Sequence, residues 1–382
     1  MLLIIGLRYI RKINYLVTEA KMKDCKLSRR KFLKYSGAVG ATLLAGTGLT
    51  GCLQENKPSQ TTKTLKAGGS STVYPIASDA QGVWQANPPA DDEEYWGPGQ
   101  YGIDTDKNLA DYWSGLYGFE EPFSITIALS HSGTGLTNLK DGLLDIADAS
   151  APVTAELDLS QSGYDKFEDH VVGFDGQPIV VSREVYEHGI DKLTLDQVAE
   201  IYGEGSDINN WEQLGGPDKE IQVVGRASGS GTDTSFRKNV LGDPKADMRS
   251  DIVRKGQNQQ VQTLVGNSDN AIAYCAINFV LQDGRVPSIG LETEDTIYAI
   301  ESIQDRFSDS NKKVMGLGAS EYPLSRELHM YTYEGTDDRE AAFLRMILSE
   351  FGQENFVKPN DYFKLSEERR KEEIDKLASP KQ

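Results

Sequence analysis

Cysteine is scarce in this chain of 382 residues, which holds only Cys25, Cys52 and Cys275. No two of them stand in a C-x-x-C spacing, so the sequence excludes a disulfide framework and a cysteine-bound zinc centre. Cys275 lies in an apolar run and is expected to be a small buried residue. Histidine is equally rare, with four copies and no H-x-x-x-H spacing. We therefore expect no metal and no cofactor.

Basic charge is also in short supply. The formal net charge is −18, and residues 53–382 carry 30 basic against 56 acidic side chains. Such a surface excludes nucleic acid as a partner and opposes the long-range approach of anions. An anion site in this chain must therefore work through local dipoles and individual cations. The length is sufficient for two domains of ordinary size.

A hydrophobic stretch long enough to span a membrane is missing from the N-terminal region. Residues 35–49 are weakly apolar and rich in glycine, and they follow the twin-arginine motif Ser28-Arg29-Arg30-Lys31-Phe32-Leu33. The stretch ends in Leu49-Thr50-Gly51-Cys52, the pattern of a lipoprotein cleavage site. Residues 1–52 are thus predicted to be a twin-arginine lipoprotein signal region, and translation is predicted to start at Met22. We expect export to be followed by lipidation of Cys52, which would anchor the protein to the outer face of the membrane, and we expect residues 53–63 to form a flexible tether.

What the sequence does contain is a recurring strand–loop–helix pattern. The loop Gly225-Arg226-Ala227-Ser228-Gly229-Ser230-Gly231-Thr232 follows a predicted strand and opens a predicted helix. The loops at residues 68–72 and 130–135 repeat this arrangement. Backbone N–H groups at a helix N-terminus favour an anion, and the guanidinium of Arg226 suits a tetrahedral one. Three such loops indicate one tetrahedral anion held from several sides.

Two helices are predicted on more ordinary signals. Leu136, Leu139 and Leu143 mark a helix that ends near Asp145, and Thr194 caps a helix over residues 195–202. Residues 87–121 contain Pro88-Pro89, acidic residues and many aromatics, and are interpreted as an insertion between regular elements.

These segments resemble the phosphate-binding proteins of Pst-type ABC importers. The resemblance lies in residues 69–75, in residues 132–136 with 145–150, in residues 226–232, and in 194–203 followed by Asn210-Trp211. It implies an α/β, two-domain periplasmic-binding-protein-like fold of type II, with a mixed sheet flanked by helices in each domain and a hinge of two crossovers. The expected first lobe is 64–172 plus 318–382, with the insertion at 87–121, and the second lobe is 173–317.

The resemblance also implies a function and a set of site residues. The protein would bind inorganic phosphate in the interdomain cleft and deliver it to ABC permease subunits, as a monomer and without catalysis. The implied phosphate-binding residues are Ser71, Thr72, Val73, Ser132, Ser150, Arg226, Ser230, Gly231 and Thr232.

One departure leaves the ligand open. Members of the family often carry an aspartate where Ser150 stands, and some carry another where Ser228 stands. A carboxylate there accepts the proton of hydrogen phosphate and repels sulfate. Asp79, Asp148 and Asp233 are candidates to replace it. Binding of another oxyanion, such as sulfate, molybdate or tungstate, is therefore the first alternative.

A secreted phosphatase-like hydrolase is the second alternative. The chain has no G-x-S-x-G elbow, and His131, beside the second loop, is the one histidine worth testing as a base. An adhesion or purely structural surface lipoprotein is a third alternative.

Overall fold

The computed structural model describes residues 64–281 and 284–381. The predicted signal region 1–52, with Met22 and Cys52, and the predicted tether 53–63 lie outside the described residues. Within those residues, no helix has both the length and the apolar character needed to cross a membrane.

The first sheet has five strands in the order β2-β1-β3-β13-β4. β1, β2 and β3 run parallel, whereas β13 is antiparallel to both of its neighbours. The strands are β1 (Leu65–Ser70), β2 (Ile125–Ser130), β3 (Ile146–Ala149), β4 (Phe167–Gly176) and β13 (Ser325–Tyr333). The carboxyl ends of β1, β2 and β3 therefore lie along one edge, where ligands gather in α/β sheets.

The second sheet has eight strands and is also mixed. The order is β12-β11-β10-β5-β9-β7-β8, with β6 paired to β10. The strands are β5 (Ile179–Val181), β6 (Lys192–Thr194), β7 (Gln222–Arg226), β8 (Val253–Lys255), β9 (Ala271–Tyr274), β10 (Ser288–Glu292), β11 (Thr296–Tyr298) and β12 (Lys313–Met315). The predicted α/β fold with two mixed sheets is confirmed.

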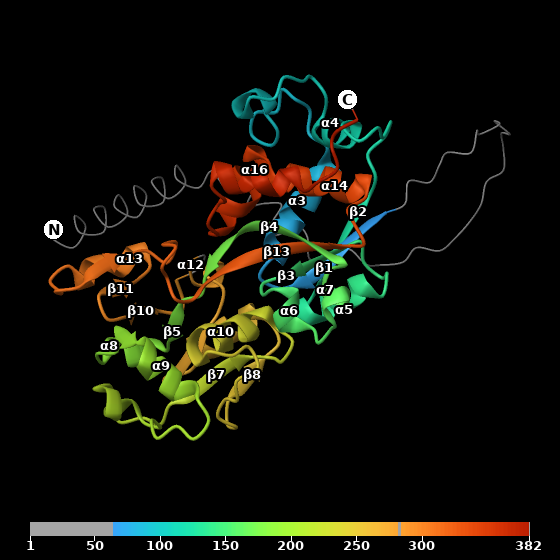
Figure 1. Ribbon diagram of the computed structural model, residues 1–382. Coiled ribbons are helices and arrows are strands. Elements are labelled where there is room, and N and C mark those ends of the chain that lie inside the picture. Colours follow the sequence, from blue (N-terminus) through green and yellow to red (C-terminus); the bar gives the residue numbers. More distant parts are fainter. Residues whose placement is uncertain (1–63, 282–283, 382) are drawn as a thin grey trace, which may run out of the picture. The chain divides into compact units, whose positions relative to one another are not determined.

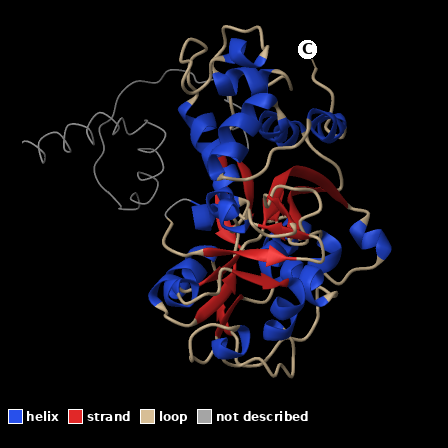
Figure 2. Cartoon of the chain, turned by 90° about the vertical axis from the view of Figure 1, so that its left-hand side faces the viewer, coloured by secondary structure: helices blue, strands red, loops and turns tan. Residues whose placement is uncertain are grey.

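Helices flank both sheets (Figure 2). Around the first sheet they are α3 (Tyr74–Ala86), α4 (Leu109–Gly115), α5 (Ser132–Lys140), α6 (Val153–Glu156), α7 (Gln161–Tyr164), α14 (Asp338–Leu348), α15 (Glu350–Gly352) and α16 (Glu367–Asp375). Around the second they are α8 (Arg183–Glu187), α9 (Leu195–Tyr202), α10 (Gly231–Leu241), α11 (Asn258–Asn267), α12 (Asn278–Leu281) and α13 (Glu301–Gln304). In Figure 1, α3 and α14 lie on one face of the first sheet and α5 and α6 on the other. The helix α3 buries Ile76, Ala80 and Trp84, whose spacing follows the helical period.

The chain crosses between the two sheets twice. It leaves the first sheet after Gly176 at the end of β4 and enters the second at Ile179. It returns between Met315 at the end of β12 and Ser325 at the start of β13. Two crossovers are the connection that a hinge between two lobes needs.

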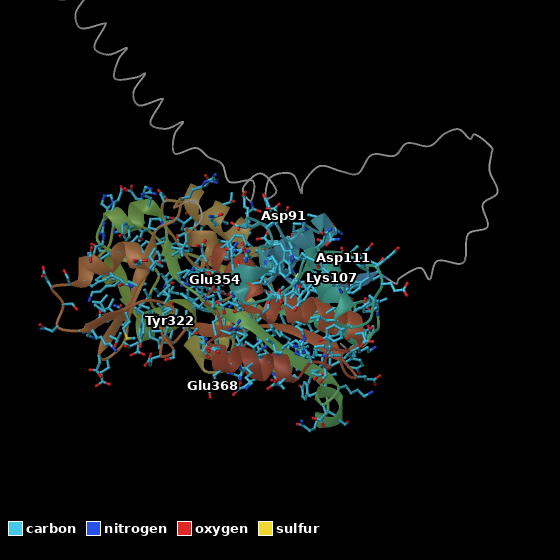
Figure 3. All side chains as sticks on the ribbon, turned by 90° about the horizontal axis from the view of Figure 1, so that it is seen from above. Asp91, Lys107, Asp111, Tyr322, Glu354 and Glu368 are labelled. Atoms are coloured by element: carbon cyan, nitrogen blue, oxygen red, sulfur yellow. The ribbon has the colours of Figure 1, made fainter. Side chains whose placement is uncertain are left out.

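The insertion at 87–121 packs as part of the first-sheet side. The ring of Trp96 meets that of Phe351 edge-on at 5.0 Å between centroids. The hydroxyl of Tyr117 donates to the carbonyl of Ala378 at 2.9 Å. Figure 3 labels Asp91, Lys107 and Asp111, which belong to this segment. Its aromatic residues are therefore core contacts with the C-terminal helices.

One predicted helix boundary is wrong. The helix α5 ends at Lys140, five residues before the predicted end near Asp145. Gly142 takes a left-handed φ of +70° and turns the chain, so Leu143 is 61% exposed. The glycine stops the helix although the leucine spacing continues. The Thr194 cap of α9 is confirmed, because its side chain accepts from the backbone N–H of Gln197 at 3.1 Å.

Candidate functional site: an oxyanion site around a buried arginine

Three helices begin at the three Gly/Ser loops. They are α3, α5 and α10, and the first two belong to the first sheet while α10 follows β7 of the second. In none of them does the side chain of the N-cap residue accept a hydrogen bond; the N-cap residues are Val73, His131 and Ser230. The first backbone N–H groups of a helix have no partner inside it. These three N-termini are therefore equipped to accept an anion.

Arg226, the last residue of β7, is the centre of the site. Its side chain is almost fully buried, at 1% exposure. It donates to the hydroxyls of Ser71 at 3.1 Å and Thr232 at 3.2 Å, and to Oδ1 of Asn258 at 2.5 Å. Two backbone carbonyls, those of Lys255 and Gly256, accept its remaining bonds. Ser71 belongs to the first sheet, so Arg226 connects the two sides.

The charge of Arg226 has no counter-ion. Among residues 64–281 and 284–381, no carboxylate lies within ion-pair distance of its guanidinium. Burial, and next the positive charge of Arg326, lower the pKa of Arg226 to about 10. The group thus stays cationic at neutral pH. A buried unpaired cation is unfavourable, so this position favours the arrival of an anion.

Hydroxyl groups from both sides close around Arg226. Oγ1 of Thr72 lies 3.2 Å from Oγ1 of Thr232. Oγ of Ser132 accepts from the backbone N–H groups of Ser150 and Gly231, both at 3.2 Å. A side chain at Gly231 would not fit, because its Cβ would lie 2.5 Å from Oγ of Ser132 and 2.7 Å from Oγ of Ser150. These residues, together with Asn258, form the Arg226 cluster: Ser71, Thr72, Ser132, Ser150, Arg226, Gly231, Thr232 and Asn258.

The other two predicted site residues, Val73 and Ser230, lie at helix starts beside the cluster. Val73 is fully buried and packs in the hydrophobic core, so only its backbone is available. Ser230 is 2% exposed, and its hydroxyl makes no capping bond. The structure brings seven predicted residues into contact and leaves these two adjacent to them.

Asn258 is a cluster member that the sequence analysis did not identify. It is the first residue of α11. Its amide donates to Thr72 at 3.2 Å and to Ser71 at 3.4 Å, while its oxygen accepts from Arg226. It stands in a run of asparagine and glutamine that follows β8 and Gly256. This strand–glycine–helix order was the available signal.

Arg326 and Asp175 form a buried ion pair beside the cluster that was also missed. The two side chains are 2.6 Å apart and at most 4% exposed. Arg326 stands on β13, where the chain returns to the first sheet, and Asp175 on β4, where it leaves. Arg326 also donates to Thr72 at 3.1 Å and to Ser235 of α10 at 3.1 Å. The pair therefore connects the crossover strands with both sides of the site.

None of the three aspartates proposed to replace a carboxylate at position 150 contacts the cluster. Asp233 accepts from Tyr274 at 2.5 Å, from Arg237 and from Arg254. Asp79 accepts from Asn360 at 2.7 Å. Asp148 is fully buried without a hydrogen-bond partner, and burial raises its pKa to about 7.

His131 lies at the N-cap of α5, near Arg226. Burial, and then the charge of Arg226, lower its pKa below the usual 6.5. The ring is thus neutral at neutral pH. A Cβ added at Gly256, on the second-sheet side, would lie 3.9 Å from Cε1 of this ring.

Comparisons with known proteins give the fold a family. One similar solved structure is from Clostridium perfringens and is described as a phosphate ABC transporter substrate-binding protein with bound phosphate. It superimposes on this chain with a TM-score of 0.56 and 21% sequence identity. The match covers 80% of this chain and 100% of that one. The PBP superfamily domain matches residues 105–350. The chain therefore belongs to the PBP superfamily.

Relatives by sequence agree with this assignment. The phosphate-binding protein PstS of Pseudomonas aeruginosa is 28% identical over 274 residues, which is 67% of this chain and 80% of that protein. The phosphate-binding protein PstS of Bacillus subtilis is 24% identical over 245 residues, or 64% of this chain and 72% of that protein. The twin-arginine translocation pathway signal sequence matches residues 26–46. The predicted twin-arginine signal is thereby confirmed, and it directs the protein out of the cytoplasm.

Proposed function

We propose that this protein binds inorganic phosphate between its two sheets and delivers it to an ABC import permease. The observation that carries the proposal is the buried guanidinium of Arg226, which has hydroxyl and carbonyl neighbours but no counter-ion among the described residues. Bare helix N-termini from both sides accompany it. A tetrahedral dianion supplies the missing charge and the acceptors at once. The relatives from Bacillus subtilis and Pseudomonas aeruginosa are named phosphate-binding proteins, which supports the binding part of the proposal.

Binding is coupled to closure of two lobes. We assign β1 to β4 and β13 with their helices to the first lobe, and the second sheet with its helices to the second. Ser71 and Thr72 come from the first lobe, and Arg226 and Thr232 from the second. An anion touches all of them together only when the lobes are closed, so it shifts the equilibrium toward the closed form. The permease then distinguishes the loaded protein by its closed shape.

The protein acts by binding alone and as a monomer, tethered to the outer face of the membrane through a lipid on Cys52. The twin-arginine signal supports export, and the Leu49-Thr50-Gly51-Cys52 pattern supports the anchor. Mass spectrometry of the membrane-bound form tests the anchor, since an unmodified Cys52 would contradict it. A chromogenic phosphate ester tests for catalysis, and we expect no turnover.

Isothermal titration of the purified exported protein with inorganic phosphate tests the function itself. We expect one site per chain and a phosphate-dependent rise in the unfolding temperature, because a ligand that binds only the folded state stabilises it. Absence of both signals at millimolar phosphate would contradict the proposal.

A further inference from the structure

The hydroxyls of the Arg226 cluster have their acceptor sites occupied by donors of the protein. A hydroxyl has one proton and two lone pairs. Oγ of Ser71 accepts from Arg226 at 3.1 Å and from Asn258 at 3.4 Å. Oγ of Ser132 accepts from the backbone N–H groups of Ser150 and Gly231. Each of these two serines therefore has only its proton left to offer.

The pair Thr72 and Thr232 is ordered in the same way. Oγ1 of Thr72 accepts from Arg326 at 3.1 Å and from Asn258 at 3.2 Å, which uses both of its lone pairs. The short contact between the two hydroxyls is then a bond from Thr72 to Thr232. Thr232 also accepts from Arg226, so its own lone pairs are used as well. The proton of Thr232 is the group that remains free.

Carboxylates are the strongest acceptors for a proton of the ligand, but those near the cluster bond to other groups or to none. Asp175 is held by Arg326 and by the backbone N–H of Ile277 at 3.0 Å. Asp233 is held by Tyr274 and two arginines, and Asp148 makes no hydrogen bond. Glu156 is engaged by the hydroxyl of Thr234 and by the backbone N–H of Gly133. Within the described chain, no hydrogen bond or ion pair joins a carboxylate to a member of the cluster.

Two neutral hydroxyls keep an unused lone pair. Oγ of Ser150 accepts from Oγ of Ser70 at 2.9 Å and has one lone pair left. The hydroxyl of Ser230 makes no capping bond. Among the hydroxyls of the site, these two serines are therefore the ones that can receive a proton of the ligand. Such a neutral hydrogen bond contributes about 0.5–1.5 kcal/mol, far less than a charged one.

We propose that this site recognises a tetrahedral dianion through donors alone, and that it therefore binds sulfate nearly as well as phosphate. The inference rests on the proposed function and specifies its ligand class. Every oxygen of sulfate is an acceptor and matches a cage of donors. Hydrogen phosphate carries one proton, for which the site offers no charged acceptor. No carboxylate of the site repels sulfate.

The first test compares the two anions on the exported protein. Titration calorimetry in a chloride-containing HEPES buffer at pH 8 measures Kd for phosphate and for sulfate. We expect the two values to lie within about a hundredfold, whereas a site built around a proton acceptor separates such ligands by roughly 10⁴. A preference for phosphate above a hundredfold overturns the inference and leaves the proposed function intact. Binding of sulfate alone, or of neither anion, refutes the proposed function and with it the inference.

A matched pair of variants tests the cause. Ser150→Asp adds a carboxylate beside the anion, and Ser150→Asn adds a side chain of the same size without that charge. We expect Ser150→Asp to raise the preference for phosphate over sulfate at least a hundredfold relative to Ser150→Asn. The crowding against Gly231 is the same in both, so it cancels in this ratio. Equal ratios in the two variants would overturn the inference. If thermal unfolding shows that either variant is unfolded, the comparison of anions on the unaltered protein decides.

Discussion

The helix N-termini of this protein are of two kinds. In α9, α14 and α16 the N-cap side chain, from Thr194, Asp337 or Ser366, accepts a backbone N–H bond of the first turn. In α3, α5 and α10 the side chain of the N-cap residue makes no such bond. These six and α11 are the helices of eight or more residues in the described parts of the chain. In α11 the side chain of Gln260 returns to the N–H groups just before the helix.

The difference between capped and uncapped N-termini indicates a loss of folding stability at α3, α5 and α10. An N-terminal cap contributes about 1 kcal/mol, so three bare helices forgo on the order of 3 kcal/mol. Serine and glycine precede α10, but the hydroxyl of Ser230 is not used as a cap. The missing caps meet around one buried guanidinium. A ligand that completes these N-termini recovers the lost hydrogen bonds when it binds.

Removing the cation of Arg226 should have the largest effect on phosphate binding. Arg226→Met keeps an apolar stem of similar length and deletes the buried charge. We expect phosphate affinity to fall more than about a hundredfold, because charge-assisted hydrogen bonds contribute about 1.5–3 kcal/mol each. The unfolding temperature without phosphate should not fall, since a buried unpaired charge is itself unfavourable. Titration calorimetry and thermal unfolding measure the two effects.

Arg249 provides the matched control for this variant. It bonds Asp251 at 2.6 Å and Asn209 at 2.9 Å, and has no contact with the Arg226 cluster. Arg249→Met should leave phosphate affinity unchanged. Equal affinity in Arg226→Met and the unaltered protein would remove the basis of the proposed function.

The carboxyl of Asp148 is a buried polar group without a hydrogen-bond partner, and it extends the comparison with the uncapped helix N-termini to an acid. Asp148 has a pKa of about 7, raised by burial from 3.8. Between these values the folded protein keeps a proton that the unfolded chain has lost, so this group lowers stability as the pH rises from about 4 to 7. Asp148→Asn should therefore stabilise the protein by about 4 kcal/mol at pH 8 and by about 2 kcal/mol at pH 5. Urea unfolding at both values measures this. A gain that is equal at the two pH values would show that ionisation is not its cause.

Closure can be blocked without touching a polar group. Gly231→Ala places a methyl group where Oγ of Ser132 and Oγ of Ser150 approach within 2.7 Å. Both serines come from the first sheet, so the two sides cannot meet as closely, and phosphate affinity should fall at least tenfold, which is about 1.4 kcal/mol. Small-angle scattering should show less phosphate-induced compaction. In Gly82→Ala, a helical position with open space around it, affinity should stay unchanged while stability rises by up to about 1 kcal/mol.

The strand–loop–helix pattern predicted the loops that meet at Arg226, and the family resemblance of those loops implied the fold class. Hydrophobic alternation and glycine placement are local signals, and both loops and strands follow from them. Asn258 and Arg326 escaped because their contacts are not local. Arg326 reaches Thr72 across 254 residues, and Asn258 reaches Ser71 across 187. Only the arrangement of the two sheets brings such residues together. The wrong end of α5 has the opposite origin, since Gly142 outweighed the leucine spacing.

The smallest effects come from the caps themselves and separate the two kinds of helix. Thr194→Ala removes the cap of α9 and should lower stability by about 1 kcal/mol without altering phosphate affinity. Ser230→Ala deletes a hydroxyl that caps nothing, so stability should change by less than about 0.5 kcal/mol. Its phosphate affinity should fall several-fold, as expected for one lost hydrogen bond to the ligand. Urea unfolding measures the stability of both variants, and calorimetry measures their phosphate affinity. If Ser230→Ala lost as much stability as Thr194→Ala and kept its affinity, Ser230 would be an ordinary cap, and the bare N-terminus of α10 would not be reserved for an anion.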